Sequence, residues 1–385
     1  MPQLSPSINK TVSKEYTVLI DFLRQATDLG ASDIFITAGF PVSAKINGEL
    51  TSLSEDKLSA FQAKELVHSV MEARYIEELT TQKEANFAVG ISGLGRFRCS
   101  AFWQRDSVGM VIRRIVTEIP KVDDLGLPAI LKDVIMAKRG LILMVGATGT
   151  GKSTSLAALI DHRNHNSKGH ILTIEDPIEF IHRHGQCVVT QREVGIDTHS
   201  FDEALKSSLR QAPDVILLGE IRSMETMEYA MSFADTGHLC VATLHANNAN
   251  QAIERIMHLA PKELHNKLLF DLSLNLRAIV AQQLVPTKQG GRKAAIEVLL
   301  NSPFVSELIQ NNRIGELKNA MKKSRESGMQ TFDMALYTLY QQGDIELEQA
   351  LHHADSPNDL RLMVKLDTNE GSDLGSLSNV SIDMD

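Results

Sequence analysis

Eight consecutive residues in the middle of the chain could bind the phosphates of a nucleotide. They read GATGTGKS and match the pattern GxxxxGK[ST], with an apolar strand-like segment before them and a helix-forming segment after them. Glycines in such a loop let consecutive backbone N–H groups and the start of the helix face the phosphate oxygens. Lys152 would reach the β and γ phosphates of ATP, and the Ser153 hydroxyl would ligate Mg²⁺. The predicted ATP site consists of Gly146, Ala147, Thr148, Gly149, Thr150, Gly151, Lys152, Ser153 and Thr154.

Acidic residues follow two other apolar strand-like segments. The stretch TIEDPIEF holds Glu175, Asp176 and Glu179, and VILLGEIR ends its apolar run at Glu220. Two like charges about 4 Å apart repel by on the order of 4 kcal/mol at an effective dielectric near 20, so the first cluster favours a cation or water between its members. Ligands of open α/β sheets bind at the carboxyl ends of strands, which favours a site over a plain acidic turn.

Two histidines flank a further apolar segment, His238 before it and His245 after it. Because an extended strand would hold them at opposite ends, their spacing is poor for binding one metal ion. One or both could hydrogen-bond the γ-phosphate or its attacking water. A structural role is the alternative for each.

Arginines are the main basic residues on the strand-like segments of the first third of the chain: Arg96, Arg98, Arg113 and Arg114. Solvated strand-face charges are the ordinary explanation for such a set. An arginine supplied to a neighbouring subunit's nucleotide can instead accelerate phosphoryl transfer by about 10³- to 10⁵-fold.

Composition limits the class of protein. The chain has 385 residues and 43% hydrophobic content, which favours two domains, each with its own core. Its net charge of −9 gives no overall attraction to nucleic acid or acidic lipid. The three cysteines are an odd number, lie far apart and form no CxxC pair, which argues against a disulfide framework or a zinc site. With neither an 18-residue apolar run nor a secretory signal, we expect a cytosolic protein with no membrane insertion.

The pattern along the chain predicts an α/β protein preceded by a small α+β domain. Helices are expected over Tyr16–Leu29 and Ser59–Leu79. Four apolar strands alternate with helical stretches from Arg139 onward, and the chain is expected to be largely helical beyond residue 265. The predicted segments are a flexible leader (1–15), an α+β domain (16–116), a linker (117–128), an ATPase domain with C-terminal helices (129–355) and an acidic, disordered tail (356–385).

Four motifs occur together, in a fixed order, between residues 146 and 249. GATGTGKSTSLAALID, HILTIEDPIEF, QREVGIDTHSFDEALKSSLRQAPDVILLGEIR and TGHLCVATLHANNA resemble the Walker A, Asp box, Walker B and His box of the secretion and type IV pilus motor ATPases. The resemblance is strongest to the retraction ATPases PilT and PilU and covers about residues 16 to 350.

The resemblance implies a role for each candidate residue. Glu179 corresponds to the general base, and Glu220 to the Walker B acid that positions Mg²⁺. The other implied site residues are the supporting acids Glu175 and Asp176, the His-box residues His238 and His245, and the arginine fingers Arg98 and Arg113.

The family also implies an architecture and partners. These are a PAS-like first domain, a RecA-like P-loop ATPase core, and a homo-hexameric ring in the cytoplasm, peripheral to the inner-membrane pilus machine. The partners would be a PilT-type motor and a PilC-like platform protein. PilT proteins have a basic helical segment where this chain has FVSELIQNN (304–312), which keeps the helix pattern but is not basic. The acidic tail is also longer than a typical PilT C-terminus. Both features favour the accessory PilU type.

Three alternatives stay open at this point. One is a primary PilT-type motor or a secretion or assembly ATPase. Another is a nucleotide-binding regulator without productive turnover, against which the intact Glu179 and Glu220 argue. The third, a RecA-like nucleic-acid translocase, conflicts with the net charge and with the lack of a basic, aromatic-rich segment, so no nucleic acid is expected.

Overall fold

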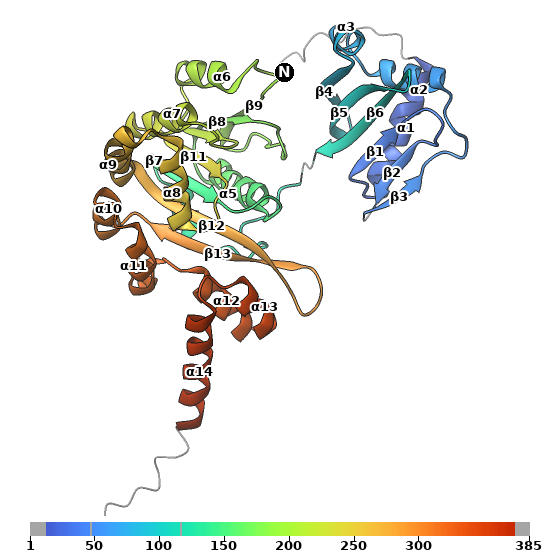
Figure 1. Ribbon diagram of the computed structural model, residues 1–385. Coiled ribbons are helices and arrows are strands. Elements are labelled where there is room, and N and C mark those ends of the chain that lie inside the picture. The colour runs from blue at the N-terminus through green and yellow to red at the C-terminus, as the bar shows by residue number, and fades with distance from the viewer. Residues whose placement is uncertain (1–12, 47, 116–117, 374–385) are drawn as a thin grey trace, which may run out of the picture. The chain divides into compact units, whose positions relative to one another are not determined.

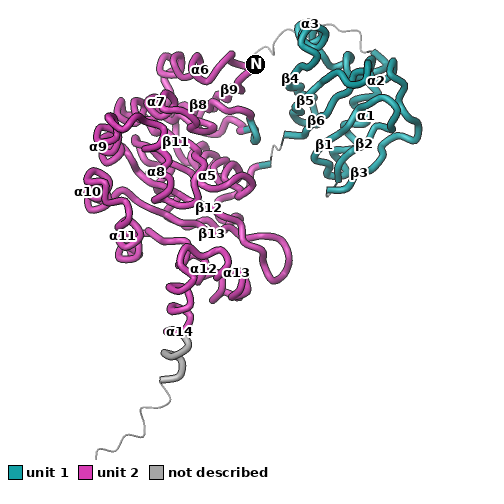
Figure 2. The backbone as a smooth tube through the Cα atoms, in the orientation of Figure 1, with its two compact units in different colours: residues 1–118, 178–181 teal, residues 119–177, 182–385 magenta. Residues whose placement is uncertain are grey.

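The computed structural model describes residues 13–46, 48–115 and 118–373. The chain divides into two compact units, which Figure 2 shows in different colours. Residues 1–118 and 178–181 form the first unit, and residues 119–177 and 182–385 form the second. The division falls between residues 118 and 119, inside the segment expected to be the linker.

The first unit is an antiparallel sheet covered on one face by helices (Figure 1). Its elements are α1 (Lys14–Asp28), β1 (Asp33–Ile36), β2 (Ser43–Ile46), β3 (Glu49–Ser52), α2 (Ala60–Ser69), α3 (Ala73–Gln82), β4 (Glu84–Ile91), β5 (Gly95–Gln104) and β6 (Ser107–Ile115). The strand order is β3-β2-β1-β6-β5-β4, and all neighbours are antiparallel. On β5, Phe97, Cys99 and Ala101 are buried, while the alternating Arg98 is half-buried. This is the expected α+β domain, and its PAS-like character stays a prediction.

The expected helix over Ser59–Leu79 is two helices. The Ser59 side chain caps the start of α2, which ends at Ser69. Glu72 then has an extended backbone and precedes α3, while Met71 between the helices is 1% exposed. The break turns Met71 into the core, and because the apolar period continues across it, the sequence pattern alone did not reveal it.

The second unit contains a seven-stranded sheet with helices on both faces. Its elements are α4 (Ile130–Ile135), β7 (Gly140–Val145), α5 (Lys152–Asn166), β8 (Gly169–Glu175), β9 (Cys187–Glu193), α6 (Phe201–Ser208), β10 (Val215–Leu218), α7 (Met224–Asp235), β11 (Leu239–Leu244), α8 (Ala249–Leu259), α9 (His265–Asn275), β12 (Leu276–Pro286), β13 (Arg292–Leu300), α10 (Pro303–Gln310), α11 (Leu317–Lys323), α12 (Phe332–Gln341), α13 (Leu347–His353) and α14 (Pro357–Asp373). The strand order is β13-β12-β7-β11-β10-β8-β9, and only β12 and β13 pair antiparallel. The α/β fold with a parallel-dominated sheet is therefore confirmed.

Strand β7 lies inside this sheet, and every one of its residues is buried. Leu141, Leu143 and Val145 pack in one core with residues of α7, α8 and α9. Ile142 and Met144 pack in another core, with residues of α4 and α5. Alternate side chains thus enter two cores, which explains why the segment reads as a continuous apolar run.

Beyond residue 265 most of the described residues are helical, as expected, in α9 to α14. The sequence pattern missed β12 and β13, which form a long hairpin whose turn holds Gly290 and Gly291 in the left-handed region. Strand β9 was also missed. The tail is not disordered from residue 356, because helix α14 spans Pro357–Asp373 and buries Leu360 completely. Residues 374–385 lie outside the described part, in which no helix is long and apolar enough to cross a membrane.

Candidate nucleotide-binding site

The predicted phosphate loop lies between the carboxyl end of β7 and the amino end of α5. The N-cap of α5 is Gly151, with a left-handed φ of 82° and no side-chain capping hydrogen bond. The helix therefore starts without a side chain over its first N–H groups, as an anion site needs. The Nζ atom of buried Lys152 donates to the carbonyl oxygens of Gly146 and Ala147, at 2.7 and 2.8 Å. The ammonium is thus held inside the curve of the loop.

A buried glutamine of β12, Gln282, is hydrogen-bonded to this loop. Gln282 donates from Nε2 to the Thr150 carbonyl at 2.8 Å, and it is 3% exposed. A Cβ on Gly146 would lie 2.5 Å from the Gln282 carbonyl oxygen, and one on Gly151 would lie 2.9 Å from its Nε2. Close approach of the Gln282 backbone thus requires glycine at 146, and the left-handed φ of 82° favours glycine at 151. Sequence reasoning missed Gln282, although the interruption of the apolar run AIVAQQLV by two glutamines was a visible signal.

The end of β10 brings an acid to the same edge of the sheet. Glu220 Oε2 lies 3.4 Å from His245 Nε2, and the Glu220 side chain is 16% exposed. Arg222 pairs with Glu220 and, at 3.7 Å, with Asp176. The hydrogen bond to Glu220 raises the pKa of Arg222. The structure therefore brings four charged or titratable side chains together from three strand ends, as the sequence predicted for Glu220, His245 and Asp176.

Gly219, directly before Glu220, allows the end of β10 to lie close to the end of β8. The Gly219 N–H donates to the Ile174 carbonyl at 2.8 Å, and a Cβ at Gly219 would lie 3.2 Å from the Glu175 Cα. Glu175 itself accepts hydrogen bonds from Thr173 at 2.6 Å and Gln191 at 3.2 Å. Its carboxylate is thus fixed beside the Walker B turn, consistent with the supporting role that the resemblance implies.

Two hollows adjoin the loop, and both belong to the second unit. One, of about 450 Å³, is lined by Ala147, Thr148, His245, Ala246, Asn247, Gln251, Glu254, Arg255 and His258. The other, of about 310 Å³, is lined by Gly146, Ala147, Thr148, Gly149, Thr150, Asn247, Gln282, Gln283, Leu284, Arg292, Phe332, His353 and Asp355. Room for a ligand therefore exists beside the phosphate loop.

His238 is not brought to this edge. Strand β11 is parallel to β7 with Leu239 opposite Gly140 and Leu244 opposite Val145, so His238 precedes the strand at the end away from the phosphate loop. Its Nδ1 lies 3.1 Å from Thr236 Oγ1 and 3.2 Å from the Phe233 carbonyl oxygen. Within this chain the geometry favours a structural role for His238 and a site role for His245.

The remaining candidates belong to the first unit, which the structure describes separately. Arg98 on β5 and Arg113 on β6 are directly opposite in the antiparallel register, so they project from the same face of the sheet. Arg113 donates from Nε to Asp33 at 2.7 Å, and Arg98 donates to the Ile178 carbonyl at 3.1 Å. Glu179 is exposed and lies in the segment 178–181 of this unit. The roles of these three residues stay predictions.

Comparison with known proteins gives a consistent result. A family model described as "Type II/IV secretion system protein" matches residues 11–295. The type IV pilus ATPase PilU of Pseudomonas aeruginosa is 59% identical over 358 residues, covering 92% of this chain and 94% of its own. The type IV pilus retraction ATPase PilT of the same organism is 37% identical over 339 residues, covering 88% of this chain and 98% of its own.

A solved structure is similar over the same range. The crystal structure of the pilus retraction motor PilT with bound ADP has a TM-score of 0.83 and 40% identity, covering 89% of this chain and 98% of that one. The likeness spans nearly all of both chains.

Proposed function

Because the chain belongs to the type II/IV secretion system protein family, within it to the PilT/PilU retraction ATPases, we propose that it is an ATP-driven motor that helps retract a type IV pilus. The observation that carries this proposal is the meeting of Lys152, Glu220 and His245 at one sheet edge. This arrangement suits transfer of a phosphoryl group to water. The high identity to a PilU over nearly the whole chain supports the pilus as the site of action.

The residues present fit ATP with Mg²⁺. The uncapped start of α5 and the buried Lys152 ammonium suit polyphosphate. In the part of the chain that is described, no cluster of three or more His, Cys, Asp or Glu side chains is arranged to hold a metal ion. Mg²⁺ bound through phosphates needs only one or two protein ligands. We assign these to Ser153 and Glu220, and the ion would offset charge on the phosphate oxygens.

The chain's own residues would perform hydrolysis in few steps. Lys152 transfers its ammonium hydrogen bonds from loop carbonyls to phosphate oxygens, which stabilises the negative charge that develops in the transition state. Glu179 accepts the proton of the attacking water, whose oxygen forms a bond to the γ-phosphorus as the bond to the ADP oxygen breaks. His245, held beside Glu220, donates a hydrogen bond to the γ-phosphate or its water.

The motor would act as a ring of identical subunits. We assign Arg98 and Arg113 to the nucleotide of a neighbouring subunit, because their shared sheet face presents two guanidinium groups together. Arg113 would then exchange its pairing with Asp33 for phosphate oxygens. The proposed assembly is a homo-hexamer in the cytoplasm, peripheral to the inner membrane, with a PilT-type motor and a PilC-like platform protein as partners.

One experiment tests the motor and its accessory character together. Phosphate release by the purified protein is measured alone and with a PilT-type partner, alongside the mass of the assembly. We expect ATP turnover in a hexameric species, and retraction in cells only when the PilT-type motor is also present. Retraction powered without that motor would assign a primary role instead, and no phosphate release in either mixture would indicate a nucleotide-binding regulator.

A further inference from the structure

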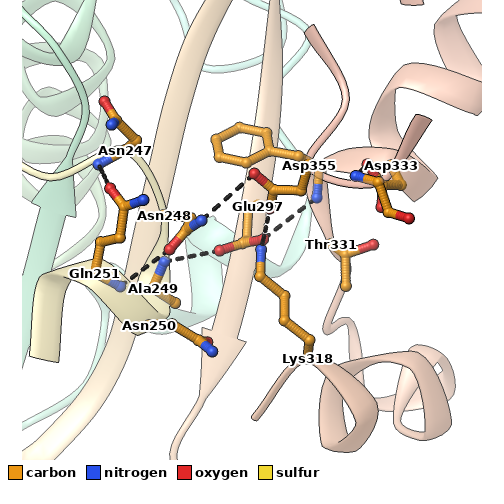
Figure 3. Close-up of polar contacts among 12 residues, drawn as sticks. Asn247, Asn248, Ala249, Asn250, Gln251, Glu297, Lys318, Thr331, Asp333 and Asp355 are labelled. Atoms are coloured by element: carbon orange, nitrogen blue, oxygen red, sulfur yellow. Dashed lines mark hydrogen bonds and ion pairs between the residues drawn. The ribbon is translucent and has the colours of Figure 1, made fainter. Parts of the chain in front are cut away.

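Glu297 is a fully buried carboxylate in the second unit, 0% exposed, on the same face of β13 as Ala295 and Leu299. Its Oε1 accepts the backbone N–H of Ala249, the first residue of α8, at 2.8 Å. Its Oε2 pairs with Lys318 of α11 and accepts the N–H of Phe332 at 3.4 Å. Figure 3 shows these groups converging on the carboxylate from separate segments. Four elements therefore meet at one side chain.

Lys318 extends the contact to the joint between α13 and α14. Its Nζ pairs with Asp355 as well as with Glu297, and Asp355 accepts from Asn248 Nδ2 at 3.4 Å. Asn248 caps α8 through the Gln251 N–H at 3.0 Å. We call Glu297, Lys318, Asp355 and Asn248 the Glu297 cluster (Figure 3). The first turn of α8 is thus held from the sheet and from the C-terminal helices.

Stability alone does not account for a charge at this place. Burial raises the pKa of Glu297, and the Lys318 ammonium opposes that rise. Burial would lower the pKa of Lys318, but attraction to Glu297 and Asp355 raises it. Buried ion pairs often contribute little, and apolar side chains of similar volume frequently replace them without loss of stability. What an apolar side chain does not replace is the acceptor for the Ala249 N–H.

Ala249, whose N–H Glu297 accepts, directly follows the segment that contains His245. Only residues 245–248, here called the His245 loop, connect the last residue of β11 with Ala249. His245 contacts Glu220, and Asn247 lines both hollows beside the phosphate loop. One end of the His245 loop is fixed by the pairing of β11 with β7, and the other end by Glu297. A shift at Ala249 would therefore move His245 relative to the phosphate loop.

We propose that Glu297 is a positioning residue for ATP hydrolysis, which holds the His245 loop in place through the first amide of α8. Lys318 and Asp355 connect this anchor to the C-terminal helices. The inference rests on the proposed function, because its readout is ATP turnover. Misplacing a catalytic group by about 1 Å can cost on the order of 100-fold in rate.

Two double variants separate positioning from stability. Glu297→Met/Lys318→Met removes the buried charges and the acceptor, whereas Glu297→Gln/Lys318→Met removes the same charges and keeps an amide oxygen for Ala249. In the full-length assembled protein, we expect kcat to fall about tenfold in the first variant, with KM for ATP within about twofold, and to stay near the wild-type value in the second. Equal kcat values in two variants of similar melting temperature would overturn the proposal.

A second pair keeps the test decisive if the methionine variant does not fold. Asn248→Ala removes the cap of α8 and the contact with Asp355, and Ser200→Ala removes the cap of α6 in the same way. Each loses about 1 kcal/mol of stability. Only Asn248→Ala is expected to lower kcat, by about threefold, and equal kcat values would refute positioning at the start of α8.

The inference and the proposed function fail in different ways. Absence of phosphate release by the wild-type protein, alone and with a PilT-type partner, would refute the proposed function. Turnover by the wild type together with equal kcat values within either pair of variants would refute only the positioning role of Glu297.

Discussion

Both ends of the seven-stranded sheet carry acidic and histidine side chains, but these side chains have different partners at the two ends. At the carboxyl end, Glu220 and His245 contact each other and His245 is half exposed beside a hollow. At the amino end, His170, Asp214 and His238 bond neighbouring backbone and hydroxyl groups. The same residue types thus differ in their partners: the carboxyl-end pair lies beside a hollow, whereas the amino-end groups are bonded to the backbone and hydroxyl groups of the fold.

At the amino end, the polar atoms of His170 have hydrogen-bond partners within the fold. The His170 N–H donates to Asp214 at 2.7 Å, and its ring nitrogens lie 2.9 Å from the Gln211 carbonyl oxygen and 2.9 Å from Thr190 Oγ1. Asp214 directly precedes β10 and thus fixes the start of β8 beside it. Gln211 and Asp214, which lie just before β10, therefore have a structural role in this sheet.

The largest expected effect belongs to the phosphate loop. Lys152→Ala should lower ATP turnover by at least about 1000-fold, because the only ammonium held inside the described part of the loop is lost. Phosphate release measures the effect, and Lys168→Ala is the matched control, because that exposed lysine directly precedes β8 at the amino end. Comparable losses of ATP turnover in the two variants would contradict a catalytic site at the carboxyl end of the sheet alone.

The acid at the carboxyl end comes next. Glu220→Gln should lower turnover by about 100-fold and raise the Mg²⁺ concentration needed for half-maximal rate, because the amide is a weaker metal ligand than the carboxylate. Asp214→Asn is its counterpart at the amino end and should retain turnover with a loss of about 1 kcal/mol of stability. A titration of phosphate release with Mg²⁺ checks both, and an unchanged Glu220→Gln enzyme would remove Glu220 from the metal site.

His238 and His245 give the sharpest comparison, because they flank the same strand, β11. His245→Ala should lower kcat about tenfold, since a hydrogen-bond donor beside Glu220 is lost. His238→Ala should leave kcat unchanged and cost about 1 kcal/mol, because its partners are Thr236 and the Phe233 carbonyl. Steady-state kinetics and thermal melting decide this, and a catalytic loss in His238→Ala would restore it to the site, for example through a neighbouring subunit.

Local signals explain what the sequence predicted. The phosphate loop, β7 and α5 follow from consecutive residues, and Glu220 follows from a strand that ends in an acid. Gln282 and Glu297 escaped prediction because their partners, Thr150 and Ala249, are 132 and 48 residues away. Such pairings depend on the order of strands in the sheet, which the sequence pattern does not specify.

The hairpin of β12 and β13 escaped for a related reason. Its strands contain alanine, lysine and glutamine, which also favour helices, and only the Gly290–Gly291 turn indicated a hairpin. Glu179, Arg98 and Arg113 differ again, because their proposed chemistry needs groups that lie outside their own unit. Their assignment therefore depends on the resemblance, and the first unit alone does not determine it.

A third histidine, His182, has its effect on stability alone and gives the smallest expected change. Burial lowers its pKa from 6.5 to about 4, against the attraction of Asp161, and its Nδ1 has no hydrogen-bond partner. The unfolded chain thus binds a proton more tightly, so stability is full above pH 6.5 and is lost as pH falls towards 4. We expect about 1 kcal/mol of this pH-dependent loss of stability to disappear in His182→Phe, less than the full pKa shift implies, because the side chain is only half-buried.

Melting temperatures between pH 7 and pH 4 measure this loss, with His199→Gln, at an exposed histidine, as control. Parallel losses in wild type and His182→Phe would show that His182 can be protonated without cost, which would place it with the accessible groups of the carboxyl end.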